Sequence, residues 1–221
     1  MVATSRSVTA VITTQSLLSP RLDEAHVLTL QEGIVIGYSA LAEIIRGTPV
    51  LATFSPGRGL LGHLADPCVQ YGIELVAKRR ETFYTEQVWN NSHNHVHTRF
   101  QAPGVCLTTH FMGRDASRKG ARKAVSRGEI AKRCTDLFAT IQSDLPAPTE
   151  KVYAHLLHGG DLIAKSAVLA IPDQSQENYP LLPWALDLGP VENLEIEEVA
   201  DTLQFAVRAL HSKLVEGREA G

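Results

Sequence analysis

The chain has 221 residues, of which 44% are apolar and 20% are charged. This composition is that of a packed globular protein and excludes a chain that is disordered throughout. The net charge of -3 excludes a uniformly basic protein that would attract nucleic acid or a membrane over its whole surface.

The domain organisation that we expect is simple. Residues 1–18 are rich in serine and threonine and are expected to form a flexible arm or an edge strand. Residues 19–221 are long enough for a single domain. The N-terminus lacks the features of a signal peptide, and no run of about 18 apolar residues predicts a membrane span. The three cysteines are widely spaced and form no zinc or disulfide pattern, which favours a cytoplasmic protein.

The first regular element is predicted to be a helix. Ser19-Pro20 is typical of a helix start, because serine caps free amides and proline suits the first turn. The apolar spacing continues to Arg46-Gly47 but is interrupted by Gly33 and Gly37. The sequence therefore indicates one broken helix or two short helices.

The next segment is read as mixed structure. Val50–Phe54 resembles a short strand, and the glycine-rich stretch 55–59 resembles a loop. Leu60–Tyr71 is expected to be a short helix that is interrupted at Asp66-Pro67.

Short segments of β-type residues follow and favour an antiparallel meander. These expected strands are Ile73–Ala77, Thr82–Trp89, His95–Phe100 and Val105–Met112. Lys151–Leu157 and Leu162–Ile171 are expected to form a hairpin about Gly159-Gly160.

Two later helices complete the expected fold. Residues 116–141 predict a long, basic central helix, and residues 196–215 predict an amphipathic C-terminal helix. Residues 172–191 are rich in proline and predict an irregular loop. The expected class is therefore α+β: one domain with an antiparallel sheet of several short strands, packed against N-terminal, central basic and C-terminal helices.

Histidines gather around the middle of the chain. His93, His95 and His97 alternate along an expected strand and so share a face. If the chain reverses at Ala102-Pro103-Gly104 and Phe100 pairs with Val105, His95 lies opposite His110 and His97 lies opposite Thr108. Such a group could hold zinc or another divalent metal that activates a water molecule, with Glu86 as a base or further ligand. The alternative is an ordinary polar sheet face.

A basic segment follows directly. Between residues 113 and 133, eight lysines and arginines stand against two acids, a net charge of +6. On a helix, several of these side chains share one face and could neutralise successive phosphates. The candidate nucleic-acid-binding residues are Arg114, Arg118, Lys119, Arg122, Lys123 and Arg127.

The basic segment can also be interpreted without an external binding partner. A helix that buries one face exposes polar residues on the other, and residues 173–201 carry eight acids and no lysine or arginine. These acids could pair with the basic segment within the chain or across a homodimer.

Three hypotheses therefore stand. The first is a protein without clear catalytic machinery that binds nucleic acid or another phosphate-bearing partner and no membrane. The second is a metal-dependent hydrolase or nuclease that uses the histidines. The third is a regulatory or structural homodimer.

Overall fold

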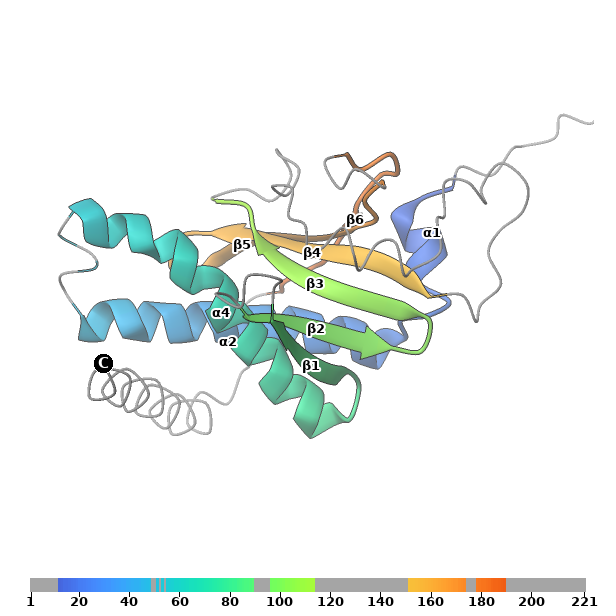
Figure 1. The fold of residues 1–221 in the computed structure, drawn as a ribbon, viewed down its shortest axis with the longest axis horizontal. Coiled ribbons are helices and arrows are strands. Elements are labelled where there is room, and N and C mark those ends of the chain that lie inside the picture. The colour runs from blue at the N-terminus through green and yellow to red at the C-terminus, as the bar shows by residue number, and fades with distance from the viewer. Residues whose placement is uncertain are drawn as a thin grey trace, which may run out of the picture.

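The computed structural model describes residues 12–48, 51, 53, 55–89, 96–113, 151–173 and 178–189. Within them, helices pack against a six-stranded sheet whose strands follow the order β1-β2-β3-β4-β5-β6 (Figure 1). The expectation of an α+β fold is therefore confirmed. The expected helices over residues 116–141 and 196–215 lie outside the described residues, as does most of the expected N-terminal arm.

The N-terminal helical region contains two helix starts, whereas the sequence predicted one, at Ser19-Pro20. Helix α1 spans Thr14–Leu18, and Ser19 is its C-cap. Helix α2 spans Glu24–Gly47, and the side chain of Asp23 caps it by accepting a hydrogen bond from the amide of His26 (3.0 Å). The prediction that Ser19-Pro20 begins the long helix was wrong, because Asp23 supplies the cap.

Helix α2 is continuous, and its glycines serve packing. A Cβ atom placed on Gly33 would lie 2.5 Å from the Cα of Ile73, and one on Gly37 would lie 2.5 Å from the Cα of Val69. From the other side, a Cβ on Gly72 would lie 2.2 Å from the carbonyl oxygen of Gly33. The backbones of two helices therefore touch at this crossing, which only glycine allows.

The partner of α2 at this crossing is helix α4, which spans Ser55–Arg80 and contains Pro67. The predicted loop at residues 55–59 and the predicted strand Ile73–Ala77 were therefore wrong. Ile73 and Val76 are β-branched, but both are fully buried on a helix, so tertiary packing overrides their local preference. By length and composition α2 could span a membrane, but 61% of the relevant stretch is buried inside the protein, as a core helix requires.

The strands form a sheet that is mostly antiparallel. Strands β1 (Tyr84–Trp89), β2 (Val96–Ala102) and β3 (Val105–Phe111) form a meander, and β4 (Val152–Gly160) and β5 (Ala164–Ala170) form the expected hairpin. Strand β6 (Trp184–Ala185) lies at the far edge. The exception is the β3–β4 pair, which is parallel.

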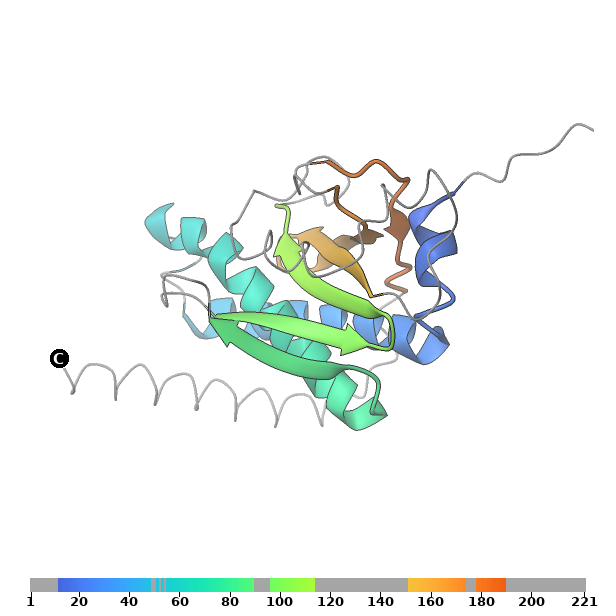
Figure 2. The ribbon, with the colours of Figure 1, turned by 45° about the vertical axis from the view of Figure 1, so that its right-hand side comes forward.

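One face of the sheet carries the main apolar core. Phe100, Leu107 and Leu156 are completely buried there together with Ile34 of α2 and Ile73 of α4. In Figure 2 the two helices lie together behind the sheet. Strand β4 is buried along its whole length, so both of its faces are covered.

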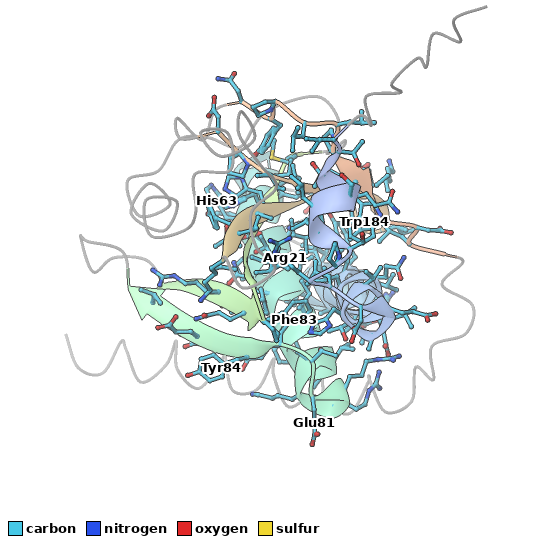
Figure 3. The ribbon with its side chains drawn as sticks, turned by 90° about the vertical axis from the view of Figure 1, so that its right-hand side faces the viewer. Arg21, His63, Glu81, Phe83, Tyr84 and Trp184 are labelled. Carbon is cyan, nitrogen blue, oxygen red and sulfur yellow. The ribbon has the colours of Figure 1, made fainter. Side chains whose placement is uncertain are left out.

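Alternation along the strands separates core from surface. Phe83 is 7% exposed, whereas its neighbour Tyr84 is 69% exposed, and Figure 3 shows the two side chains at the start of β1. The same alternation along β3 and β4 decides which of their side chains lie on the same face of the sheet.

Candidate functional site

Most of the candidate residues lie outside the described part of the chain. This holds for His93 and His95, and for every basic candidate: Arg114, Arg118, Lys119, Arg122, Lys123 and Arg127. His97 lies in β2, where its backbone pairs with Val88 of β1. His110 lies on β3 near the end of the strand. Binding of metal and binding of nucleic acid therefore remain predictions.

The pairing that we expected for the histidines was wrong in register. Phe100 pairs with Leu107, and Ala102 pairs with Val105, because the turn contains only Pro103 and Gly104. Gly104 has a φ of 75°, which suits such a tight turn. Pairing between β2 and β3 ends at Phe100, and the two strands diverge beyond it (Figure 2).

Glu86, expected as a base or ligand, has other partners. Its carboxylate accepts a hydrogen bond from the amide of Gln101 (2.9 Å) and lies 3.7 Å from the guanidinium of Arg99. Both partners lie on β2, so Glu86 is part of a polar pairing within the β1–β2 hairpin.

His110 belongs instead to a polar cluster on β3 and β4, which we call the sheet cluster. Its members are Thr108, His110, Tyr153, His155 and Tyr179. The imidazole rings of His110 and His155 lie 4.4 Å apart between centroids. His155 is completely buried, and Thr108 and Tyr153 are each 4% exposed.

Hydrogen bonds run through the whole sheet cluster. The hydroxyl of Thr108 lies 2.9 Å from Nε2 of His110 and 2.8 Å from the hydroxyl of Tyr153. The same Tyr153 hydroxyl lies 3.1 Å from Nε2 of His155, whose Nδ1 lies 2.9 Å from the hydroxyl of Tyr179. Both nitrogens of His155 are therefore occupied by hydroxyl partners, as a buried imidazole requires.

Within the described residues, the sheet cluster brings together two imidazoles and three hydroxyl groups. Among the described residues, no group of three or more histidine, cysteine or acidic side chains is placed to hold a metal ion. The cluster contributes two imidazoles and no carboxylate, whereas a zinc site needs at least three protein ligands. Within the described part of the chain, its polar atoms bind one another.

The hydroxyl of Tyr153 is the centre of this network and gives a testable expectation. We expect Tyr153→Phe to lower the free energy of unfolding by about 1–3 kcal/mol, because Thr108 and His155 would each lose a buried partner. Tyr84→Phe is the matched control, since Tyr84 is exposed. Urea denaturation of both variants measures the difference. Equal stability of the two variants would show that the network contributes nothing.

A second polar group lies on the opposite face of the sheet, against the helices. It consists of Tyr38 of α2, Asp66 of α4 and His158 of β4, and we call it the clamp. Nε2 of His158 lies 3.1 Å from Oδ1 of Asp66, and Nδ1 lies 3.2 Å from the hydroxyl of Tyr38. The amide of Gln70 donates to Oδ2 of Asp66 at 2.7 Å.

Burial and charge alter the acidity of the clamp. Burial alone would raise the pKa of Asp66, but the hydrogen bond and charge of His158, together with the side chains of Thr109 and Gln70, outweigh burial and hold this pKa below its ordinary value of 3.8. The pKa of Tyr38 is raised, first by burial and then by the negative charges of Asp66 and Asp161. Tyr38 therefore remains a neutral phenol and is no candidate nucleophile.

Sequence reasoning found only part of these two groups. The spacing of His155 and His158 predicts opposite faces of a strand, and the structure places them so, one in each cluster. Their partners could not be found in this way, because Asp66 is 92 residues from His158 and Tyr38 is 120 residues from it. The Asp66-Pro67 pair was interpreted only as an interruption of a helix.

The fold and the two clusters define this chain as an α+β protein with a helix pair on a mostly antiparallel sheet. Comparison with known proteins adds no family: the chain matches no protein-family model, no curated protein and no solved structure.

Proposed function

We propose that this protein binds a polyanionic partner, most directly nucleic acid, through the basic segment Arg114–Arg133. The observation that carries the proposal is the net charge of +6 in this segment of a chain whose total charge is -3. Lysine and arginine side chains that neutralise phosphates release condensed cations from the nucleic acid, which drives binding.

The distribution of charge in the described residues supports this proposal. Several basic side chains there already have a carboxylate partner: Arg79 and Arg80 contact Glu32, and Lys78 lies 2.8 Å from Glu74. Lys165 likewise lies 3.0 Å from Asp161. The basic segment differs in composition, since it carries only two acids of its own against eight cations.

The acidic region 173–201 is the competing partner for the basic segment. Two of its acids are described, and both accept hydrogen bonds from their own loop. Asp173 accepts from the side-chain amide of Asn178 at 2.9 Å, and Asp187 accepts from the backbone amide of Gly189 at 3.0 Å. These bonds join each of the two carboxylates to a residue of its own loop.

The position of the segment in the fold is also suitable. It belongs to the part of the chain between the end of β3 at Phe111 and the start of β4 at Val152. Connections between elements tolerate sequence change and commonly carry binding residues on a rigid scaffold. The scaffold here is the buried pair β3–β4.

The test is binding of labelled single-stranded and duplex oligonucleotides, measured by fluorescence anisotropy at 50 and 200 mM salt. We expect affinity to fall steeply with salt. Arg118→Ala with Arg122→Ala should weaken binding about tenfold or more and lower the slope of log K against log salt by about two.

The matched control is Arg79→Ala with Arg80→Ala, which removes the same charge from the end of α4, where both side chains pair with Glu32. This control should bind like the natural chain. If nothing binds at 50 mM salt, or if both double variants lose affinity equally, the proposal is wrong. Absence of binding together with a dimer in light scattering would favour pairing of the acidic and basic segments between two copies.

A further inference from the structure

The clamp joins three elements that are far apart in the sequence. Tyr38 is 2% exposed and His158 is completely buried, whereas the side chain of Asp66 is 25% exposed. The imidazole therefore lies in the interior between the helix pair and the sheet, and the carboxylate lies at the rim, where water can reach it. A proton can be exchanged at Asp66 without prior unfolding.

The groups around the clamp can be stated for each element packed against it. Helix α2 contributes Tyr38, and α4 contributes Asp66 and the uncharged Gln70. Strand β3 contributes Thr109, whose buried side chain helps to lower the pKa of Asp66, and Phe111, whose ring centroid lies 5.7 Å from that of His158. The turn after β4 contributes Asp161, whose charge reaches Tyr38 and whose carboxylate pairs with Lys165.

The state of Asp66 decides whether these contacts are favourable. An ionised carboxylate accepts hydrogen bonds from both His158 and Gln70, and these charge-assisted bonds are strong. A neutral carboxyl accepts them only weakly, because it carries no charge to strengthen them. Protonation of Asp66 therefore weakens its hydrogen bonds with His158 and Gln70.

The backbone of α4 makes this position a natural point of release. Pro67 follows Asp66 and has no N–H, so the helix lacks one internal hydrogen bond here. On the C-terminal side, α4 is locked to α2 by the contacts of Gly72 and Ile73. Figure 1 shows α4 changing direction near its middle. The clamp thus fastens α4 to the sheet next to Pro67, where the helix lacks an internal hydrogen bond.

We propose that Asp66, His158 and Tyr38 form an acid-sensitive clamp: ionised Asp66 holds α2 and α4 on the sheet, and protonation of Asp66 releases them locally. The direction follows from linkage. A carboxyl with a lower pKa in the folded chain than in the unfolded chain adds stability above the unfolded value. It loses that stability as the pH falls through the folded value. Release therefore occurs below the ordinary aspartate value of 3.8.

The test is hydrogen exchange, together with thermal unfolding between pH 6 and pH 2, on the full chain. Asp66→Asn should expose the backbone amides around residues 62–70 and 156–160 already at pH 6, with exchange about tenfold faster. The thermal unfolding midpoint of Asp66→Asn should fall less, as the pH is lowered, than the midpoint of the natural chain, so that the two curves of midpoint against pH converge at low pH.

Gln70→Met is the second variant, for the case that Asp66→Asn does not fold. It removes a donor whose hydrogen bond is stronger to ionised Asp66 than to neutral Asp66, so release should begin at a higher pH. Asp23→Asn is the control, because the backbone amide and imidazole of His26 also lower the pKa of this exposed carboxyl. It should affect only the first turn of α2. Parallel curves for Asp66→Asn and the natural chain, or an unchanged release pH in Gln70→Met, would overturn the proposal.

Discussion

Gly37→Ala is expected to destabilise the protein by about 3 kcal/mol, the size of a severe overpacking change. The new methyl group would lie 2.5 Å from the Cα of Val69 and 2.7 Å from the carbonyl oxygen of Cys68. Both atoms belong to the backbone of α4, so no side chain can rotate away to make room. The helices must separate, and the contacts that depend on their distance are weakened.

The control for this substitution lies on the same helix. Gly47 is the last residue of α2, and a Cβ atom there would meet nothing within 4 Å. Gly47→Ala should leave stability unchanged or raise it by up to about 1 kcal/mol, because alanine restricts the unfolded chain. Thermal unfolding of both variants measures the contrast. A Gly37→Ala protein as stable as the Gly47→Ala protein would contradict the close crossing of α2 and α4.

Phe100→Ala is expected to cost about 3–5 kcal/mol, because it removes a large buried ring and leaves a cavity. Phe100 is completely buried on the helix-covered face of the sheet, and its ring packs edge-on against Phe83 with centroids 6.3 Å apart. Its pair with Leu107 is also the pair of the β2–β3 hairpin that lies farthest from the turn. Loss of the ring therefore weakens the core where the hairpin meets the helices.

Tyr84→Ala provides the comparison, since it removes an aromatic ring from the same hairpin. Because Tyr84 is 69% exposed, Tyr84→Ala should lower the free energy of unfolding by less than about 1 kcal/mol. Chemical denaturation gives both values. Equal losses in the two variants would mean that Phe100 is not part of the main core.

The strands were more predictable than the helices. Runs of β-type residues bounded by turn signals located β1 to β5 to within a few residues. The turn at Pro103-Gly104 was also visible in the sequence. Register was not, because the expected pair Phe100–Val105 leaves four residues in the turn, whereas the observed pair Ala102–Val105 leaves two and shifts every other pair.

The region 50–80 shows why local preference failed for a helix. Its glycines, Pro67 and β-branched residues each argue against helix when taken alone. Gly72 is needed for the contact with Gly33, and Ile73 fills the core beside it. These advantages arise only once α2 is in place, so a window of neighbouring residues does not contain them.

The polar clusters were hidden for the same reason. A strand pattern shows that His155 and His158 point to opposite faces of the sheet, but it does not show which side chains contact them there. Tyr38 and Asp66 lie on helices, and Thr108 lies on a strand whose pairing with β4 is parallel rather than antiparallel. Each partner is fixed by the assembled fold.

The parallel pair β3–β4 has a consequence for the order in which the chain folds. The helix pair and the meander β1–β2–β3 join neighbours in sequence, and so does the β4–β5 hairpin. Bringing β3 to β4 instead closes a loop over residues 112–151, which costs conformational entropy before any pairing rewards it. Such non-local closure slows folding. We therefore expect the local contacts on either side of this segment to form first, and the pairing of β3 with β4 to be the slowest step of folding. Lengthening the segment between the two strands should change the folding rate far more than the free energy of unfolding.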